Sequence, residues 1–128
     1  MNFLVDECIS PKVANSLKAV FNGKRSDINF YHVVKDKPFY KGMPDSEFFD
    51  ILQNKSDWCV LSLDGFRQWK LLIKSSDFLV VNLKVIKKDK IPKQASLLID
   101  NVLCNSSDWC KKRRGQIYAM TRTGKLKS

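Results

Sequence analysis

Apolar residues along this chain occur in short blocks that alternate between two spacings. Residues 2–6 (NFLVD) form an apolar run that ends abruptly in Asp6 and Glu7. A run that is apolar at consecutive positions predicts a strand buried on both faces, with its acids delivered to one end. Ser10 followed by Pro11 is typical of a helix start. The helix itself is predicted by apolar residues at helical spacing: Val13, Leu17, Val20 and Phe21.

The same alternation continues to the end of the chain. Residues 28–34 predict a second strand, and the prolines and glycine of residues 35–44 predict a loop. The later blocks predict a helix at 45–55, a strand at 58–64, a helix at 65–74, a strand at 78–86, a helix at 92–104 and an edge strand at 115–125. Strands that alternate with helices predict an α/β fold, with a mainly parallel sheet covered by helices on both faces.

Carboxylates occupy one kind of position in this scheme. Asp6 and Asp64 end two buried strands, and Asp45 begins the helix just before the second of them. Because ligands gather at the carboxyl ends of parallel strands, we expect Asp6, Asp45 and Asp64 to converge, with Glu7 and Glu47 nearby. Clustered carboxylates repel one another unless a cation compensates them, and oxygen ligands favour Mg²⁺ or Mn²⁺. The pattern predicts a divalent metal site.

Each of these acids also has a structural explanation. On this explanation Asp45 would be an ordinary helix cap, Asp64 and Gly65 would form an ordinary turn pair, and Glu7 would be a solvated loop residue. Asp6, at the end of a buried strand, is the hardest to explain in this way. Their joint placement at strand ends and a helix start on one edge favours a functional interpretation.

Length and composition limit the class of protein. The 128 residues suit a single domain, 1–128, that needs no metal or disulfide for its stability. No stretch approaches the ~18 apolar residues of a membrane helix, so we expect a cytoplasmic protein that makes no membrane contact. The four cysteines lack a C-x-x-C pair and are predicted to be free thiols, with Cys8 and Cys59 in the core.

Positive charge is concentrated near the end of the chain. The net charge is +10, and the basic C-terminal segment 111–128 holds seven Lys and Arg residues without an acid, which leaves about +3 for the remainder. Such a segment favours a polyanion, an acidic protein partner or simple solubility.

Several of these segments together resemble a known family. The stretches FLVDECISPKVANSLKAV and MPDSEFFDILQNKSDWCVLSLDGF, with the terminal IYAMTRTGKLK, are similar to the PIN-like domain family, in particular to the short branch of VapC-type toxins of toxin–antitoxin systems. The resemblance rests on an F-L-x-D-E strand end followed by S-P, an acidic helix start in mid-chain, and an apolar strand ending in S/T-x-D.

The resemblance implies a three-layer α/β/α sandwich and a metal-dependent ribonuclease site. It makes Asp6, Asp45 and Asp64 the catalytic metal ligands, with Asp64 in the S/T-x-D position after Ser62. It also implies a cognate antitoxin partner and a homodimer. Two features depart from the family pattern. A further helix-borne glutamate has no counterpart here except Glu7, and Leu63 stands where a basic residue is frequent.

We therefore hypothesise hydrolysis of RNA phosphodiester bonds. Ser62 is placed to orient a water or a ligand. The cations nearest in sequence to the predicted edge are Lys37, Lys41, Arg67 and Lys70, and the C-terminal cluster adds Arg113 and Arg114 for longer-range capture of RNA. His32 lies in a predicted strand and is given no role as a general base.

Other classes remain open on the sequence alone. A phosphatase using Asp6 as nucleophile would want an aspartate where Cys8 stands. A receiver-like signalling domain would use a lysine late in the fold, for which Lys84 is available. A catalytically inactive PIN-like module that binds nucleic acid or protein is the third alternative.

Overall fold

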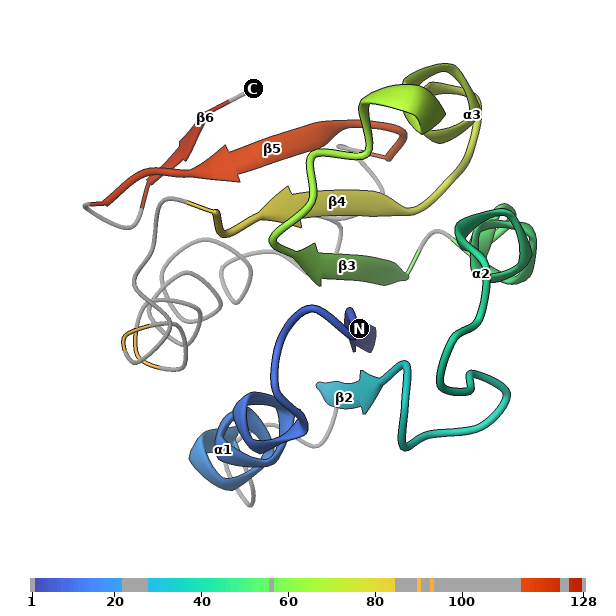
Figure 1. Ribbon diagram of the computed structural model, residues 1–128. Helices are drawn as coiled ribbons and strands as arrows, with labels where there is room; N and C mark the ends of the chain where they lie inside the picture. Colours follow the sequence, from blue (N-terminus) through green and yellow to red (C-terminus); the bar gives the residue numbers. More distant parts are fainter. Residues whose placement is uncertain are drawn as a thin grey trace.

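The computed structural model describes residues 2–21, 28–55, 57–84, 90, 93, 114–122 and 125–127 (Figure 1). In this part of the chain the strands are β1 (Asn2–Val5), β2 (Asn29–His32), β3 (Trp58–Ser62), β4 (Leu79–Asn82), β5 (Ile117–Met120) and β6 (Leu126–Lys127). The helical elements are α1 (Pro11–Phe21), α2 (Asp45–Leu52), the short 3-10 helix η1 (Arg67–Trp69) and α3 (Lys70–Lys74).

The strands described here form one sheet in the order β2-β1-β3-β4-β5-β6. The first five pair in parallel, and β6 pairs antiparallel with β5. The predicted α/β class with a mainly parallel sheet is therefore confirmed.

The prediction of a strand within residues 115–125 is confirmed by β5, whereas its predicted position at the edge of the sheet is wrong. The chain turns back after β5, where the Thr121 N–H donates to the Lys125 carbonyl (2.7 Å) and the Lys125 N–H donates to Thr121 Oγ1 (3.0 Å). This turn lays β6 along β5, so β6 is the edge. A strand as short as β6 has too few residues to show an alternating pattern in the sequence.

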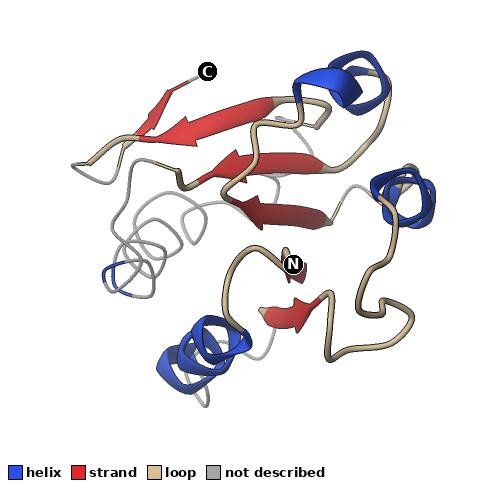
Figure 2. Ribbon diagram, viewed as in Figure 1, coloured by secondary structure: helices blue, strands red, loops and turns tan. Residues whose placement is uncertain are grey.

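Helices cover both faces of the sheet, as the secondary-structure colours show (Figure 2). Along β1, Phe3 and Val5 point to one face and Leu4 to the other, as the period of a strand requires. The first face packs on α1 through Ala14, Leu17 and Phe21. The second packs on α2 and α3 through Phe48, Phe49, Leu52 and Ile73. Burial on both faces explains the uninterrupted apolar runs, and each such side chain stabilises the fold by roughly 1.5–3 kcal/mol.

The helix boundaries differ from the predictions in two places. The helix predicted over 45–55 ends at Leu52, where the Lys55 N–H closes a turn onto the Leu52 carbonyl (2.9 Å). The helix predicted over 65–74 begins late, because Phe66 has a φ of 50° that no right-handed helix accepts. The predicted start of α1 is confirmed, since Ser10 Oγ accepts the Lys12 N–H (3.2 Å). The helix predicted at 92–104 and the end of the strand predicted at 78–86 lie outside the described residues.

None of the helices in the described part of the chain is long and apolar enough to cross a membrane. Cys8 and Cys59 are free thiols. Cys59 is buried in β3 as predicted, whereas the prediction of a core position for Cys8 is wrong, because Cys8 lies exposed in the turn after β1. The other two cysteines, Cys104 and Cys110, lie outside the described residues.

Candidate active site at the carboxyl edge of the sheet

The strand order of the sheet reverses between β1 and β3. From β1, the chain adds β2 on one side and β3 on the other. At such a switch point the loops that leave the two neighbouring strands diverge to opposite faces and open a space at the carboxyl edge. Asp6 and Asp64 leave β1 and β3 at this point, as the sequence predicts.

Asp6 is a buried carboxylate held by specific donors. Its exposed fraction is 8%, and its N–H donates to the Leu61 carbonyl (3.0 Å), which extends the pairing of β1 with β3. Oδ1 accepts the Glu7 N–H (2.8 Å), and Oδ2 accepts the Ser62 hydroxyl (2.8 Å). These donors fix the orientation of the carboxylate.

Ser62 connects Asp6 to the loop that carries Asp64. Its hydroxyl, fully buried at the end of β3, donates to Asp6 and accepts the Asp64 N–H (2.9 Å). The Asp64 carboxylate accepts the Phe66 N–H (2.8 Å) in a turn that places Phe66 in the left-handed region and its ring in the core. Asp64 is thus a turn residue, as its structural explanation predicts. It is also exposed and anchored to the same serine as Asp6.

Asp45 is the first residue of α2 and does not cap the helix. Pro44 holds the N-cap position, and no side chain there makes a capping bond, so the structural explanation of Asp45 as a cap is wrong. Burial raises the pKa of Asp45, and the neighbouring carboxylates of Asp6, Asp64 and Glu7 raise it further. The buried indole N–H of Trp69 has no hydrogen-bond acceptor within bonding distance in the described structure, yet it lies near enough to Asp45 to oppose this rise. The three aspartates therefore lie within electrostatic reach of one another.

The two glutamates tie the loop between β2 and α2 to this region. Glu7 Oε2 accepts the Gly42 N–H (3.2 Å). The Glu47 carboxylate accepts the Tyr40 hydroxyl, which raises the pKa of Tyr40. Glu7 therefore contributes to the field at Asp45, whereas the carboxylate of Glu47 bonds to the loop.

A cleft of about 780 Å³ opens beside Asp64. The turn after β1, the loop after β3 and the end of β4 form its walls: Cys8, Leu63, Asp64, Gly65, Phe66, Arg67, Gln68, Asn82 and Lys84. The Cys8 thiol accepts the Leu63 N–H (3.4 Å) and lies 3.6 Å from Asp6 Oδ2. Although Cys8 is exposed as a residue, partial burial of its sulfur, together with the nearby Asp6, raises the pKa of the thiol and keeps it protonated at neutral pH. Cys8 is a hydrogen-bonding wall residue rather than a nucleophile.

A family model described as PIN-like domain matches residues 1–76, which include β1, β3, the start of α2 and all three aspartates. The chain belongs to the PIN-like domain family. No curated protein and no solved structure matches it. The family model identifies the PIN-like domain and does not distinguish the VapC-type branch.

Cations predicted to contact RNA lie in different places on this PIN-like domain. Arg67 lines the cleft beside Asp64. Lys37 and Lys41 are exposed on the loop before α2, and Lys70 is exposed at the start of α3. Arg114 pairs with Asp77 (3.5 Å) just before β5 and β4 begin, so it lies at the opposite edge of the sheet from the aspartates. Arg113 lies outside the described residues.

The carboxylates of this PIN-like domain fit a hard divalent cation by their chemistry. They supply oxygen donors, and neither ion pair found between described residues involves Asp6, Asp45 or Asp64. Among the described residues, however, no three His, Cys, Asp or Glu side chains lie close enough together to hold an ion. The donor set suits Mg²⁺ or Mn²⁺ without forming a closed coordination sphere.

Sequence reasoning did not assign Cys8, Asn82 and Lys84 to this site of the PIN-like domain. Asn82 and Lys84 follow a buried strand at its carboxyl end, which is the same signal that selected Asp6 and Asp64. His32 plays no part in the site. It is buried, its Nε2 bonds the Ile9 carbonyl (2.6 Å), and its Nδ1 accepts the Val34 N–H (3.1 Å).

Proposed function

We propose that this PIN-like domain is a Mg²⁺- or Mn²⁺-dependent endoribonuclease. PIN-like domains are often nucleases, which supports phosphodiester hydrolysis as the reaction class. The observation that carries the proposal is the hydrogen-bonded group of Asp6, Ser62 and Asp64 at the switch point of the sheet. Asp45 makes no capping bond in α2, and the charges of Asp6 and Asp64 act on its carboxylate. A capping or turn function alone would not require one buried hydroxyl to bond both a buried carboxylate and the backbone N–H of a second aspartate.

Asp6, Asp45 and Asp64 are the residues that would hold the metal. A divalent ion bound there supplies a Lewis acid for a phosphate oxygen and a water of lowered pKa. Ser62 keeps the Asp6 carboxylate in one orientation and fixes the loop of Asp64. Burial and neighbouring acids raise the pKa of Asp45, so this carboxylate is readily neutralised by a proton or a cation.

The cleft supplies the groups that bind the substrate phosphate. Arg67 and Lys84 provide two cations on its walls, close to the single carboxylate of Asp64. The two cations would hold a phosphodiester beside the Asp64 carboxylate, which alone would repel it. Arg67 is a sequence-predicted RNA contact in this role, and we add Lys84 to the proposal because it lines the same cleft.

The first experiment is cleavage of a mixed pool of structured and unstructured RNAs by the purified protein. We expect cleavage with Mn²⁺, none with EDTA, and loss of cleavage in the folded variants Asp6→Asn and Asp64→Asn. The matched control is Asp50→Asn, because Asp50 is an exposed aspartate later in α2. Cleavage that persists in EDTA, or in both site variants, would refute a metal-dependent nuclease site at these aspartates, and no cleavage under any condition would refute the nuclease assignment itself.

A second candidate is a PIN-like module that binds nucleic acid without cleaving it. The separation of the carboxylates favours it, since no metal-binding group is preformed among the described residues. Binding of RNA without cleavage under any metal would support this candidate. Family membership leaves the receiver-like alternative without support.

The biological setting follows from the resemblance to VapC-type toxins alone. A toxin role, a cognate antitoxin and a homodimer stay predictions, because the family match extends to the PIN-like domain and no further.

A further inference from the structure

The carboxyl edge of the sheet changes charge along its length. Aspartates follow β1 and β3, whereas exposed cations follow the strands beyond them: Lys84 after β4, Arg122 after β5 and Lys125 before β6. Residues 78–84 and 114–127 contain no acidic residue. Among the described residues, the charged side chains at the ends of β4, β5 and β6 on this edge are therefore all basic.

Strand register places these cations level with the acidic site. Val5 pairs with Leu61, so Asp6 and Ser62 come next in one row across the sheet. Ser62 pairs with Asn82, Asn82 with Ala119, and Ala119 with Lys127, which continues that row to β6. Two positions farther along the strand direction stand Asp64, Lys84, Thr121 and Lys125. The acidic and basic residues thus share one edge instead of lying at opposite ends of the strands.

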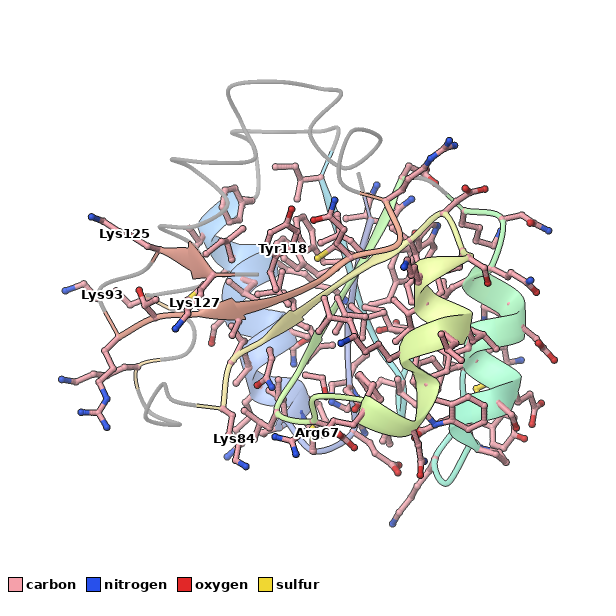
Figure 3. The ribbon with its side chains drawn as sticks, turned by 90° about the horizontal axis from the view of Figure 1, so that it is seen from above. Arg67, Lys84, Lys93, Tyr118, Lys125 and Lys127 are labelled. Atoms are coloured by element: carbon pink, nitrogen blue, oxygen red, sulfur yellow. The ribbon has the colours of Figure 1, made fainter. Side chains whose placement is uncertain are left out.

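The cleft joins the two parts of the edge. Asp64, Arg67 and Lys84 line the same cleft, and the Leu83 N–H donates to the Ser62 carbonyl (2.8 Å), which holds the end of β4 against the end of β3. In the view from above, Arg67 and Lys84 lie next to one another, and Lys125 and Lys127 lie farther along at β6 (Figure 3). We define the basic edge as Arg67, Lys84, Arg122 and Lys125.

The length of the basic edge suits a linear polyanion. Three strand spacings separate β3 from β6, or about 14 Å at about 4.8 Å per strand. A single phosphate group would engage only one end of such a surface, whereas a polynucleotide backbone presents a charge at each nucleotide. The recessed cleft at one end admits a strand whose bases are unstacked, which favours single-stranded RNA over a duplex.

We propose that single-stranded RNA binds along the basic edge, from Lys125 toward Arg67, and that this path delivers one phosphodiester to Asp64. Binding along the basic edge stands on charge and register, and only the delivery to Asp64 rests on the proposed nuclease function. From Asp64, the path runs toward β4 and away from Asp6 and Asp45. It excludes the β2–α2 loop, where the sequence-predicted contacts Lys37 and Lys41 lie.

The test measures RNA binding in EDTA, where metal-dependent cleavage does not occur. Fluorescence anisotropy of a labelled single-stranded 12-mer compares the full chain with the double variant Lys84→Ala/Lys125→Ala and with Lys37→Ala/Lys41→Ala. The matched control is Lys55→Ala, an exposed lysine between α2 and β3 at the opposite edge of the sheet. All variants remove exposed charges, and circular dichroism checks their folding.

We expect the basic-edge double variant to lose about 10-fold in affinity, with a slope of log K against log salt that is shallower by about 1.4. The Lys37/Lys41 variant and Lys55→Ala should change affinity less than twofold, and the duplex of the same sequence should bind more weakly than the single strand. Equal losses in both double variants, tighter binding of the duplex, or binding of polyglutamate with no binding of RNA would overturn the proposal. Because no cleavage is needed, a catalytically silent protein would refute the proposed nuclease function and leave this result intact.

Discussion

The acidic and basic parts of the carboxyl edge are built in different ways. Asp6 and Ser62 are buried, and hydrogen bonds through Ser62 link them to Asp64. The basic edge consists of exposed side chains in η1 and in the segments next to β4, β5 and β6. Chemistry at a phosphate requires fixed positions, whereas attraction of a polyanion requires only charge in the right region. Substitutions in the acidic part should therefore affect catalysis and folding, and substitutions in the basic edge should affect binding alone.

The largest expected effect is that of Asp64→Asn. We expect metal-dependent cleavage to fall about 100-fold or more, since a proposed metal ligand is lost. Affinity for RNA in EDTA should stay the same or rise, because a negative charge leaves the cleft that holds Arg67 and Lys84. Asparagine keeps an oxygen that can accept the Phe66 N–H, so the turn should survive. Parallel losses of cleavage and binding would show that the two parts of the edge are not separable.

Ser62→Ala should weaken the acidic part by removing the hydrogen bonds that hold Asp6 and the loop of Asp64. The variant removes the donor to Asp6 and the acceptor of the Asp64 N–H, both in a buried place. We expect the free energy of unfolding, measured with urea, to fall by about 1–3 kcal/mol and cleavage to fall about 10-fold or more. Ser75→Ala is the control, because the Ser75 hydroxyl bonds a helix carbonyl on an exposed surface (2.9 Å). Equal stability of both variants would contradict the role given to Ser62.

Lys84→Ala should change only substrate binding. We expect KM for single-stranded RNA to rise several-fold, kcat to stay within about twofold, and the free energy of unfolding to change by less than about 0.5 kcal/mol. Steady-state kinetics at two salt concentrations measure the effect, which should shrink at the higher salt. A large fall in kcat with unchanged KM would place Lys84 among the groups that act on the reacting phosphate.

The smallest effect is expected for Glu7→Gln, which should lower the pKa of Asp45. Glutamine removes one of the negative charges that raise this pKa and keeps an oxygen for the Gly42 N–H. The pKa can be followed by NMR of the carboxyl carbons in the metal-free protein. Glu47→Gln is the control, because the Glu47 carboxylate bonds Tyr40 instead. An unchanged pKa in Glu7→Gln would mean that Glu7 does not act on Asp45.

The same pKa has a consequence for stability. Because the pKa of Asp45 is raised in the folded state, this group favours the fold at pH values below its unfolded pKa, and that contribution is lost as pH rises through the folded value. Glu7→Gln should make the stability of the protein less sensitive to pH in this window. Urea unfolding over the acidic range measures this difference.

The sequence was sufficient to predict the acids at the strand ends, because that signal is local. Asp6 and Asp64 each follow an uninterrupted apolar run, and parallel pairing brings such ends to one edge. For Asp45 the sequence also offered a helix-cap explanation, but Pro44 takes the N-cap position.

Features that depend on pairing between distant segments were not predictable in the same way. The turn at Thr121 and Lys125 makes β6 the edge, and it brings Lys125 to the side of the acids. The bond between Ser62 and Asp6 joins residues 56 positions apart. Cys8 was assigned to the core from its apolar neighbours, yet it lies in a turn whose direction is set by the Glu7 N–H bond to Asp6.

Direct binding of Mn²⁺ tests the central claim that the carboxylates after β1 and β3 form a metal site. Electron paramagnetic resonance of free Mn²⁺ in a titration with the protein measures binding without any RNA. We predict saturable binding by the wild-type chain and by Asp50→Asn, with affinity at least about 10-fold weaker in Asp64→Asn. Absence of Mn²⁺ binding, or equal affinity in Asp64→Asn and Asp50→Asn, would contradict the claim.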